Sequence, residues 1–192
     1  MIDFKECKIE DIEELQKLSQ ITYLNSFISI LNEDDVKIYT SIKYSLENLK
    51  IELENKTTQF LFLTLDNEKI GYIKYDYNSA KLKNSLDIDR IYLLDTHKNK
   101  GLGSKLLQKA ESIAKEKNKS HLTLGVLKLN KPAISFYEKK NFTIFDEENI
   151  SIGNNNYVLL HMMKNIWFFL NEVIFYSKRE IKSIVKLKPR YF

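Results

Sequence analysis

The feature that most constrains the fold is a short glycine loop, "KNKGLGS", which stands between a strand-like and a helix-like segment. The segment before it, "SLDIDRIYLL", is rich in β-branched and aromatic residues, which is typical of a buried strand. After it, apolar residues recur along one helical face from Leu102 to Ala114, which predicts a helix over 102–117. The loop is therefore predicted to lead from a strand into the first turn of a helix.

The start of such a helix is suited to bind an anion. Its first main-chain N–H groups have no partner within the helix and lie at the positive end of the helix dipole. Gly101 and Gly103 lack the Cβ atoms that would hold a phosphate away from the main chain. Lys98 and Lys100 add positive charge, and Ser104 offers a hydroxyl donor. Glycines that serve only the geometry of the turn remain an alternative.

Two common nucleotide-binding motifs are excluded by spacing. A Walker loop ends in Gly-Lys-Ser/Thr, which is missing here, and the Rossmann fingerprint needs a third glycine where Leu106 stands. The loop therefore belongs to neither class.

The remaining pattern predicts one domain in which helices and strands alternate. With 43% hydrophobic residues, the 192-residue chain can bury the core of a domain of ordinary size. Periodicity and turn signals predict strands at 2–8, 58–65, 70–78, 85–94, 121–127, 142–148 and 156–164, and helices at 9–27, 32–55, 102–117 and 130–140. This order predicts the α/β (α+β) fold class.

Charge and composition narrow the range of partners. The net charge of +4 belongs to the end of the chain, since residues 1–166 carry 24 basic and 24 acidic side chains and residues 167–192 carry six and two. A neutral domain disfavours nucleic acid as a partner. No uncharged apolar run reaches the roughly 18 residues of a membrane span, and the N-terminus has no apolar signal core. A cytoplasmic location is therefore expected.

Cysteine and histidine give no sign of a disulfide or a metal site. Cys7 is the single cysteine, which excludes a disulfide within the chain, and it is predicted to be a small buried residue. His97, His121 and His161 show no ligand spacing, so no metal is expected.

Two motifs together resemble the Gcn5-related N-acetyltransferase (GNAT) family. "KNKGLG" is similar to its Gln/Arg-x-x-Gly-x-Gly/Ala pyrophosphate loop, with Lys98 at the Gln/Arg position. "NKPAISFYEKKNF" resembles its Asn-x-x-Ala-x-x-Phe-Tyr-x-x-x-Gly-Phe segment, with Asn141 at the glycine position, where a left-handed backbone is expected. The strands from "TTQFLFL" to "HLTLGV" further resemble the PaiA-type spermidine/spermine acetyltransferases.

The resemblance implies a fold and a domain organisation. Residues 1–165 are expected to form a GNAT domain, with a mixed, mostly antiparallel sheet of six to seven strands flanked by about four helices. Residues 166–192 are expected to form an extra, basic amphipathic C-terminal helix. Its apolar stripe would be covered by the domain itself, by a second copy in a homodimer or by an anionic membrane.

The resemblance also implies acetyl-CoA as cosubstrate, without a metal. The main chain at 91–93 is expected to pair with the pantetheine, and the amide of Leu93 to polarise the thioester carbonyl. Asn130 is expected to contact the cofactor or to cap its helix. The expected cofactor-binding residues are Ile91, Tyr92, Leu93, Lys98, Asn99, Lys100, Gly101, Leu102, Gly103, Ser104, Asn130 and Tyr137.

Direct transfer to an amine needs a proton acceptor and a proton donor. An alkyl amine with a pKa of about 10.4 is almost fully protonated at pH 7. Asp87, eleven residues before Lys98, matches the position where the family often has a glutamate base. Because aspartate is one methylene shorter than glutamate, the proton is expected to pass through a bound water. Asp89 is the alternative base, and both acids could instead pair with Arg90. Tyr137 matches the general acid of the family, which protonates the leaving thiolate.

The acceptor is predicted to be a primary amine, with a polyamine favoured by the resemblance. A polycation needs several carboxylates, which Glu33, Asp34 and Asp35 supply together. Acids in the first turn of a helix also complement its dipole, so these three have a second explanation. Peptide or protein amines and small antibiotic amines remain alternative acceptors. A non-catalytic regulator that binds acetyl-CoA as a signal is the competing functional class.

Overall fold

The computed structural model describes residues 1–78 and 81–166, so the predicted C-terminal helix lies outside the described residues. The strands are β1 (Ile2–Glu6), β2 (Thr58–Leu65), β3 (Glu68–Asp76), β4 (Ser85–Leu93), β5 (His121–Leu127), β6 (Thr143–Ile152) and β7 (Asn155–Asn165). The helices are α1 (Ile12–Phe27), α2 (Glu33–Lys43), α3 (Leu46–Glu54), α4 (Leu102–Glu116) and α5 (Lys131–Glu138), with short 3-10 helices η1 (Ile9–Asp11) and η2 (Asp95–His97).

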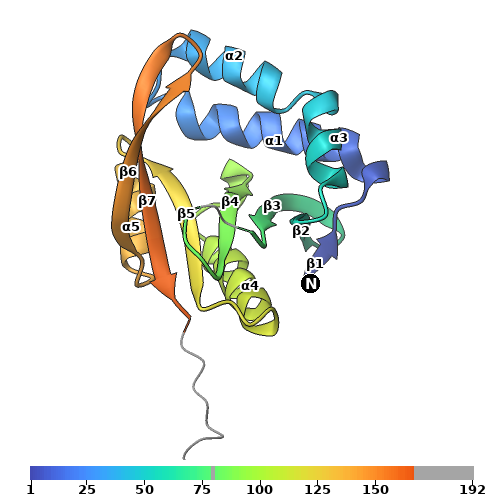
Figure 1. Ribbon diagram of the computed structural model, residues 1–192. Coiled ribbons are helices and arrows are strands. Elements are labelled where there is room, and N and C mark those ends of the chain that lie inside the picture. The colour runs from blue at the N-terminus through green and yellow to red at the C-terminus, as the bar shows by residue number, and fades with distance from the viewer. Residues whose placement is uncertain (79–80, 167–192) are drawn as a thin grey trace, which may run out of the picture.

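All seven strands form one sheet in the order β1-β2-β3-β4-β5-β7-β6. Only the β4–β5 pair is parallel, and the other five pairs are antiparallel. Helices α1, α2 and α3 lie on one side of the sheet and α4 lies on the other (Figure 1). This is the mixed, mostly antiparallel sheet that the sequence predicts.

Each face of the sheet has its own hydrophobic core. Strand alternation divides β2 between them, because Phe60 and Phe62 face one side and Leu63 faces the other. The α4-side core includes Ile73, Leu86, Ile88, Leu106, Ala110, Leu122 and Met162. The α1-side core includes Leu15, Tyr23, Val36, Leu49, Phe60, Phe62 and Tyr72. Full burial of one leucine, isoleucine, valine, phenylalanine or methionine side chain stabilises the fold by about 1.5–3 kcal/mol.

The prediction of a single helix over 32–55 was wrong. Helix α2 ends at Lys43 and α3 starts at Leu46, so the described residues contain five α-helices. Ser45 caps α3, since its hydroxyl accepts a hydrogen bond from the main-chain N–H of Asn48 (3.2 Å). The side chain of Gln16 donates to the carbonyl of Tyr44 (2.8 Å) and satisfies a group that the break leaves without a helical partner.

A β-bulge in β4 determines the shape of the sheet at its centre. Lys74 of β3 is opposite Arg90, but Tyr75 is opposite Ile88, so Asp89 is an extra residue in β4. The bulge reverses which residues face which side: Ile88 lies in the α4-side core, whereas Tyr92 packs on the α1-side core. Pairing of β4 with β5 ends at Ile88, and the two strands separate beyond it (Figure 1).

A buried ion pair fixes α3 to β4 beside the bulge. The guanidinium of Arg90 donates to both carboxylate oxygens of Glu52 (2.8 and 2.7 Å), and the two side chains are only 3% and 14% exposed. The ammonium of Lys74 lies 3.2 Å from Glu52 and 2.6 Å from Asp89. Burial opposes ionisation of Glu52, but Arg90, Lys74 and Lys43 together lower its pKa.

We predict that Glu52→Ala lowers the free energy of unfolding by about 3–5 kcal/mol, because it leaves Arg90 buried without a partner. Urea denaturation measures the change. Glu54→Ala is the matched control on the same helix, since Glu54 has only an exposed pair with Lys50 (3.9 Å), and a change below about 0.5 kcal/mol is expected.

The pH dependence of this contribution to stability follows from the lowered pKa of Glu52. Its contribution to stability is present above the unfolded-state pKa and is lost as the pH falls through the folded-state pKa. The wild-type and Glu52→Ala stabilities should therefore converge in acid. Equal losses for the two glutamate variants would contradict the assignment.

Candidate active site

The connection between β4 and α4 has a backbone that only certain residues adopt easily. Asn99 and Gly101 both have positive φ angles, of 60° and 76°. Asparagine tolerates this left-handed conformation and glycine adopts it without strain. Gly101 is also the residue that immediately precedes α4, so the predicted turn into a helix is confirmed.

Five consecutive main-chain donors are left open in this loop. Within the described part of the chain, the N–H groups of residues 99–103 make no hydrogen bond, whereas those of Ser104 and Lys105 bond to the carbonyl of Gly101 (3.1 and 3.3 Å). The open donors gather at the positive end of the α4 dipole. Such a row of N–H groups binds phosphate oxygens.

Neither the backbone conformation nor the packing of the described residues requires glycine at position 103. Its φ is not positive, and an added Cβ would meet only ring carbons of Phe136 at 3.6 and 3.9 Å, which is ordinary contact. Glycine within a helix costs about 1 kcal/mol relative to alanine. Because neither backbone nor packing requires glycine here, close approach of a ligand to the main chain is the physical reason that remains.

The two lysines of the loop differ in their surroundings. Lys98 pairs with Asp95 (2.5 Å), and its ammonium lies 3.4 Å from the hydroxyl of Ser26 on α1. Lys100 is exposed and has no ion-pair partner among residues 1–78 and 81–166. The charge of Lys98 is therefore partly neutralised, and the main-chain donors are the stronger feature of the loop.

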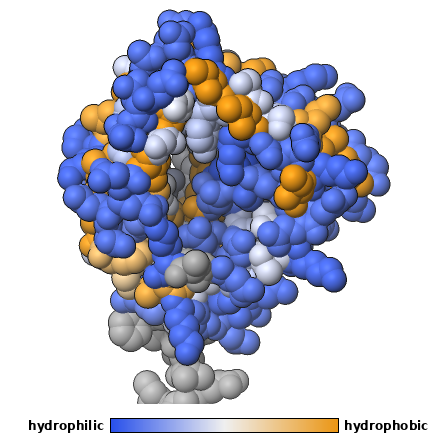
Figure 2. Space-filling model, turned by 45° about the horizontal axis from the view of Figure 1, so that its top comes forward, coloured by the Kyte–Doolittle hydropathy of each residue, from blue (hydrophilic) through white to orange (hydrophobic). Residues whose placement is uncertain are grey.

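Next to this loop, β4 has an unpaired edge on the side of β5, which we call the slot. Parallel pairing joins Ser85–Ile88 to residues 121–124 and then stops, so Asp89–Leu93 has no partner on β5. Unpaired strand edges accept an extended ligand as an added strand. Ile91, Tyr92 and Leu93, the residues predicted to pair with the pantetheine, lie along this edge. The molecular surface is hollowed near the middle of the view in Figure 2.

Tyr137 lies on α5, which is fixed at its start by Asn130. The side-chain oxygen of Asn130 accepts from the N–H of Ala133 (3.2 Å), so the capping role predicted for this residue is present. The ring of Tyr137 packs between Phe136 and Phe142, with centroids 5.2 and 5.6 Å away. Burial raises the pKa of Tyr137 to about 12, so the phenol remains a proton donor at neutral pH.

The predicted left-handed residue of the second motif is confirmed. Asn141, which follows α5 at the family's glycine position, has a φ of 66°.

The structure distinguishes the two candidate bases on β4. Asp87 accepts a hydrogen bond from the hydroxyl of Thr123 on β5 (2.5 Å), and its pKa is raised, mainly by burial and further by Asp89 and Asp76. Asp89 is an ion-pair partner of Lys74. Burial opposes its charge, but Arg90 and Lys74 hold the pKa of Asp89 below its ordinary value. A raised pKa suits a base that works near neutral pH, so Asp87 is the better candidate.

The acids at the start of α2 have structural partners. Asp35 is 1% exposed and accepts hydrogen bonds from the N–H of Asn154 (2.7 Å), the amide of Asn155 (2.7 Å) and the phenol of Tyr157 (2.8 Å). It thereby holds the turn between β6 and β7. Glu33 pairs with Lys37 (2.6 Å). We therefore assign Asp35 a structural role in place of the predicted contact with substrate.

Gly153 is required at that turn. Its φ is 58°, and an added Cβ would overlap Asp35. The side chain of Asn32 caps α2 by accepting hydrogen bonds from the N–H groups of Asp34 and Asp35 (2.9 and 3.2 Å). The acidic segment therefore lies in the first turn of a helix, where acids complement the helix dipole.

Sequence reasoning missed the neighbours of Asp87. Thr123 lies on the adjacent strand, and His161 of β7 acts electrostatically on Asp87. His161 is 6% exposed, and its Nε2 lies 3.0 Å from a carboxylate oxygen of Glu148 on β6. The only local signal was a polar residue among the apolar residues of "VLLHMM". Among the described residues, no three His, Cys, Asp or Glu side chains are grouped as a metal site.

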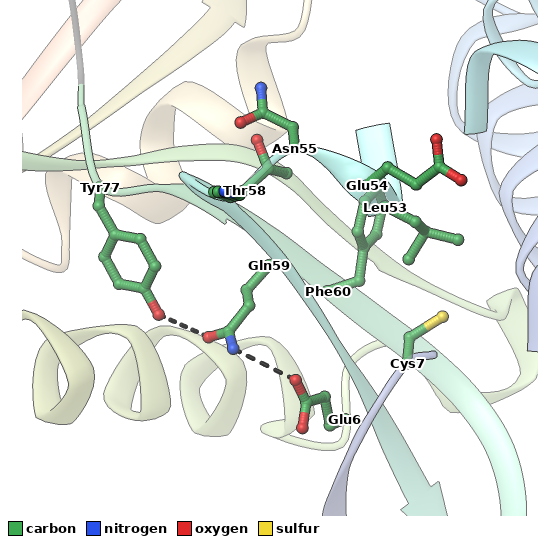
Figure 3. A pocket seen from close by; sticks show the side chains of 10 residues that line it. Glu6, Cys7, Leu53, Glu54, Asn55, Thr58, Gln59, Phe60 and Tyr77 are labelled. Atoms are coloured by element: carbon green, nitrogen blue, oxygen red, sulfur yellow. Dashed lines mark hydrogen bonds between the residues drawn. The ribbon is translucent and has the colours of Figure 1, made fainter. Parts of the chain in front are cut away.

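A second hollow lies away from these residues. A pocket of about 320 Å³ is bordered by β1, β2 and the end of α3. Figure 3 shows Tyr77 bonded to Gln59 and Gln59 bonded to Glu6 in this pocket. Burial, together with Asp11, raises the pKa of Cys7 to about 12, so its thiol stays protonated. None of the predicted site residues lines this pocket, and we assign it no chemistry.

Comparison with known families decides the class of the protein. Residues 24–142 match the acetyltransferase (GNAT) family. The chain belongs to this family. It is an acyltransferase with the GNAT fold. Among the described residues, no helix has the length and apolar character needed to cross a membrane.

Two curated relatives cover most of the chain. It is 31% identical over 150 residues to an uncharacterised N-acetyltransferase of Lactobacillus delbrueckii subsp. lactis, covering 76% of this chain and 87% of that protein. It is 28% identical over 151 residues to spermidine N(1)-acetyltransferase of Thermoplasma acidophilum, covering 77% and 91%.

Solved structures agree with the fold. The PaiA N-acetyltransferase of Thermoplasma acidophilum, crystallised in complex with coenzyme A, superposes with a TM-score of 0.70 at 27% identity, covering 86% of this chain and 99% of that chain. A probable acetyltransferase from Staphylococcus epidermidis has a TM-score of 0.71 at 16% identity, covering 87% and 100%, and shows the fold alone.

We predict that Gly103→Ala has opposite effects on stability and on coenzyme A binding. The free protein should gain up to about 1 kcal/mol, because alanine favours the helix and its Cβ fits against Phe136. Affinity for coenzyme A should fall at least about tenfold, because the same Cβ separates the diphosphate from the main chain. Thermal unfolding and calorimetry measure the two effects. Unchanged affinity would show that the diphosphate does not approach Gly103.

Proposed function

We propose that the protein transfers an acetyl group directly from acetyl-CoA to a primary amine, and that the amine belongs to a polyamine. The observation that carries this proposal is the position of Asp87, a half-buried carboxylate with a raised pKa, on β4 just before that strand leaves β5. The phosphate-binding loop follows the same strand. A cofactor bound along the slot would extend its thioester toward this carboxylate.

The residues divide the chemistry as follows. The open N–H groups of 99–103 bind the diphosphate, and the unpaired edge at Ile91–Leu93 binds the pantetheine. The main-chain N–H of Leu93 polarises the thioester carbonyl. Asp87 accepts a proton from the amine through a bound water, and Tyr137 donates a proton to the departing thiolate. We assign these functions to the domain formed by residues 1–165.

The polyamine assignment has two supports. The relative from Thermoplasma acidophilum is named a spermidine N(1)-acetyltransferase. On the α1-side face of the sheet, Asp87 also has further carboxylates near it, since both Asp89 and Asp76 raise its pKa. Several carboxylates within reach of one another suit an acceptor that carries more than one positive charge.

The decisive experiment is a thiol-release assay with acetyl-CoA and a panel of amines that includes spermidine. Turnover with spermidine well above that with monoamines supports the proposal. A preference for peptide amines would show that the acceptor is a peptide or protein and not a polyamine. Tight binding of acetyl-CoA without turnover on any amine would identify a regulator and overturn the catalytic assignment.

We predict that Tyr137→Phe lowers kcat about 10²–10³-fold at pH 7, because the thiolate then leaves without a proton donor. Coenzyme A affinity should change no more than a few-fold, since the ring still packs against Phe136 and Phe142. Tyr77→Phe is the matched control, because that phenol bonds to Gln59 in the remote pocket (2.5 Å). Equal kcat values for the two variants would exclude Tyr137 as the acid.

We predict that kcat/KM of the wild type falls as the pH drops through the pKa of Asp87, which must be ionised to accept a proton. Because that pKa is raised, the fall should begin nearer neutral pH than for an exposed carboxylate. Asp87→Asn should remove the part of this fall that protonation of Asp87 causes, and it should lower activity about 10²-fold or more. If Asp89→Asn removes that part of the fall instead, the base is Asp89.

A further inference from the structure

His161 has the properties of a residue that acts on a ligand. It is 6% exposed on β7, and its Nε2 is held at 3.0 Å by the carboxylate of Glu148 on β6. The other ring nitrogen, Nδ1, has no hydrogen-bond partner among residues 1–78 and 81–166. A buried imidazole normally uses both nitrogens. Nδ1 is not one of the fully buried polar atoms that lack a partner, so it is open to solvent and can be reached by a substrate or by water.

The register of the strands brings His161 toward Asp87. His161 lies opposite Gly125 on β5, and Gly125 follows two residues after Thr123, whose hydroxyl binds Asp87. Residues two apart on a strand face the same side, so all four lie on the α1-side face. Gly125 has no side chain, and an added Cβ would crowd Leu159. At that position β5 places no side chain between His161 and the slot.

Glu148 determines which nitrogen of His161 carries the proton. Hydrogen bonds from Lys81 (2.7 Å) and His161 lower the pKa of Glu148, so its carboxylate is ionised and accepts from Nε2–H. The neutral imidazole then has its lone pair on Nδ1. A carboxylate that holds one nitrogen so that the other accepts a proton is the arrangement found in Ser-His-Asp triads.

The reaction itself requires a second proton acceptor. An amine with a pKa of about 10.4 arrives as an ammonium ion with three N–H bonds, and the amide product of a primary amine keeps one. Two protons must leave the nitrogen, one before it attacks and one when the tetrahedral intermediate collapses. Asp87 accounts for one of them only.

We propose that His161, oriented by Glu148, accepts the first proton from the ammonium form of the acceptor amine at Nδ1. This inference rests on the proposed function. An N–H bond of the ammonium breaks and an Nδ1–H bond forms, which gives imidazolium and a free amine. The amine lone pair then forms the C–N bond and the C–S bond breaks. Tyr137 protonates the thiolate, Asp87 takes the second proton and returns it through water to Tyr137, and the proton held by His161 passes to solvent, so that one proton is released per turnover.

The charges around His161 favour this role. Glu148 and Asp146 face it from β6, and Asp87 faces it from β4. Lys81 pairs with Glu148 (2.7 Å), and β5 contributes Thr123 and Gly125, which carry no charge. Carboxylates therefore surround the imidazolium that forms, and they stabilise its positive charge.

The test compares His161→Asn with His121→Asn as matched control, because His121 bonds to Ser120 at the start of β5 (2.7 Å). With spermidine at pH 7, kcat/KM of His161→Asn should fall about 100-fold. The loss should shrink to within about fivefold near pH 9.5, because the fraction of free amine rises tenfold per pH unit. An aromatic amine, which is neutral at pH 7, should lose little at either pH. The control should stay within about twofold throughout.

Glu148→Gln provides an independent measurement, because Glu148 is half-exposed and its replacement leaves the core intact. It should show the same pH-dependent loss at smaller size, with coenzyme A affinity unchanged. A loss in His161→Asn that is equal at both pH values and for both amines, or no loss, overturns the inference while the proposed function stands. If the wild type acetylates no amine, both fall together.

Discussion

The extra residue at Asp89 is the constraint on which the whole site depends. By adding one residue to β4, it ends pairing with β5 at Ile88 and leaves the following edge open. It also turns Arg90 toward the α1 side of the sheet. There the two hydrogen bonds from Arg90 to Glu52 fix the strand to α3. The same strand carries a candidate base before the bulge and a free edge after it, so proton transfer and cofactor binding share one rigid element.

Main-chain groups carry most of the expected binding in this architecture. Residues 99–103 offer five open N–H groups, while the lysine at the motif's first position is paired with Asp95. This is consistent with Lys98 at the position where the resemblance to the family leads us to expect glutamine or arginine. A backbone donor cannot be removed by side-chain substitution, and only the glycines that expose it are sensitive. In the proposed mechanism, side chains are then available for proton transfer with the acceptor amine.

The sequence predicted much of this structure, because periodicity and turn residues depend only on neighbours along the chain. Strands β2 and β5 were predicted to the residue, the glycine loop leads from a strand into a helix as predicted, and Asn141 has the predicted left-handed backbone. The break at Tyr44–Ser45 was missed because apolar periodicity continues across it. The bulge at Asp89 and the partners of Asp87 were missed because register and cross-strand neighbours arise only when strands pair. The roles of the site residues stay predictions.

The clamp of Asp35 on the β6–β7 turn limits how such an enzyme can diversify. One carboxylate binds the main chain of Asn154 and the side chains of Asn155 and Tyr157, over a glycine that leaves it no spare room. Inserting or deleting a residue in this hairpin would detach three bonds at once. Side chains on this hairpin can therefore be exchanged, whereas its length is held constant.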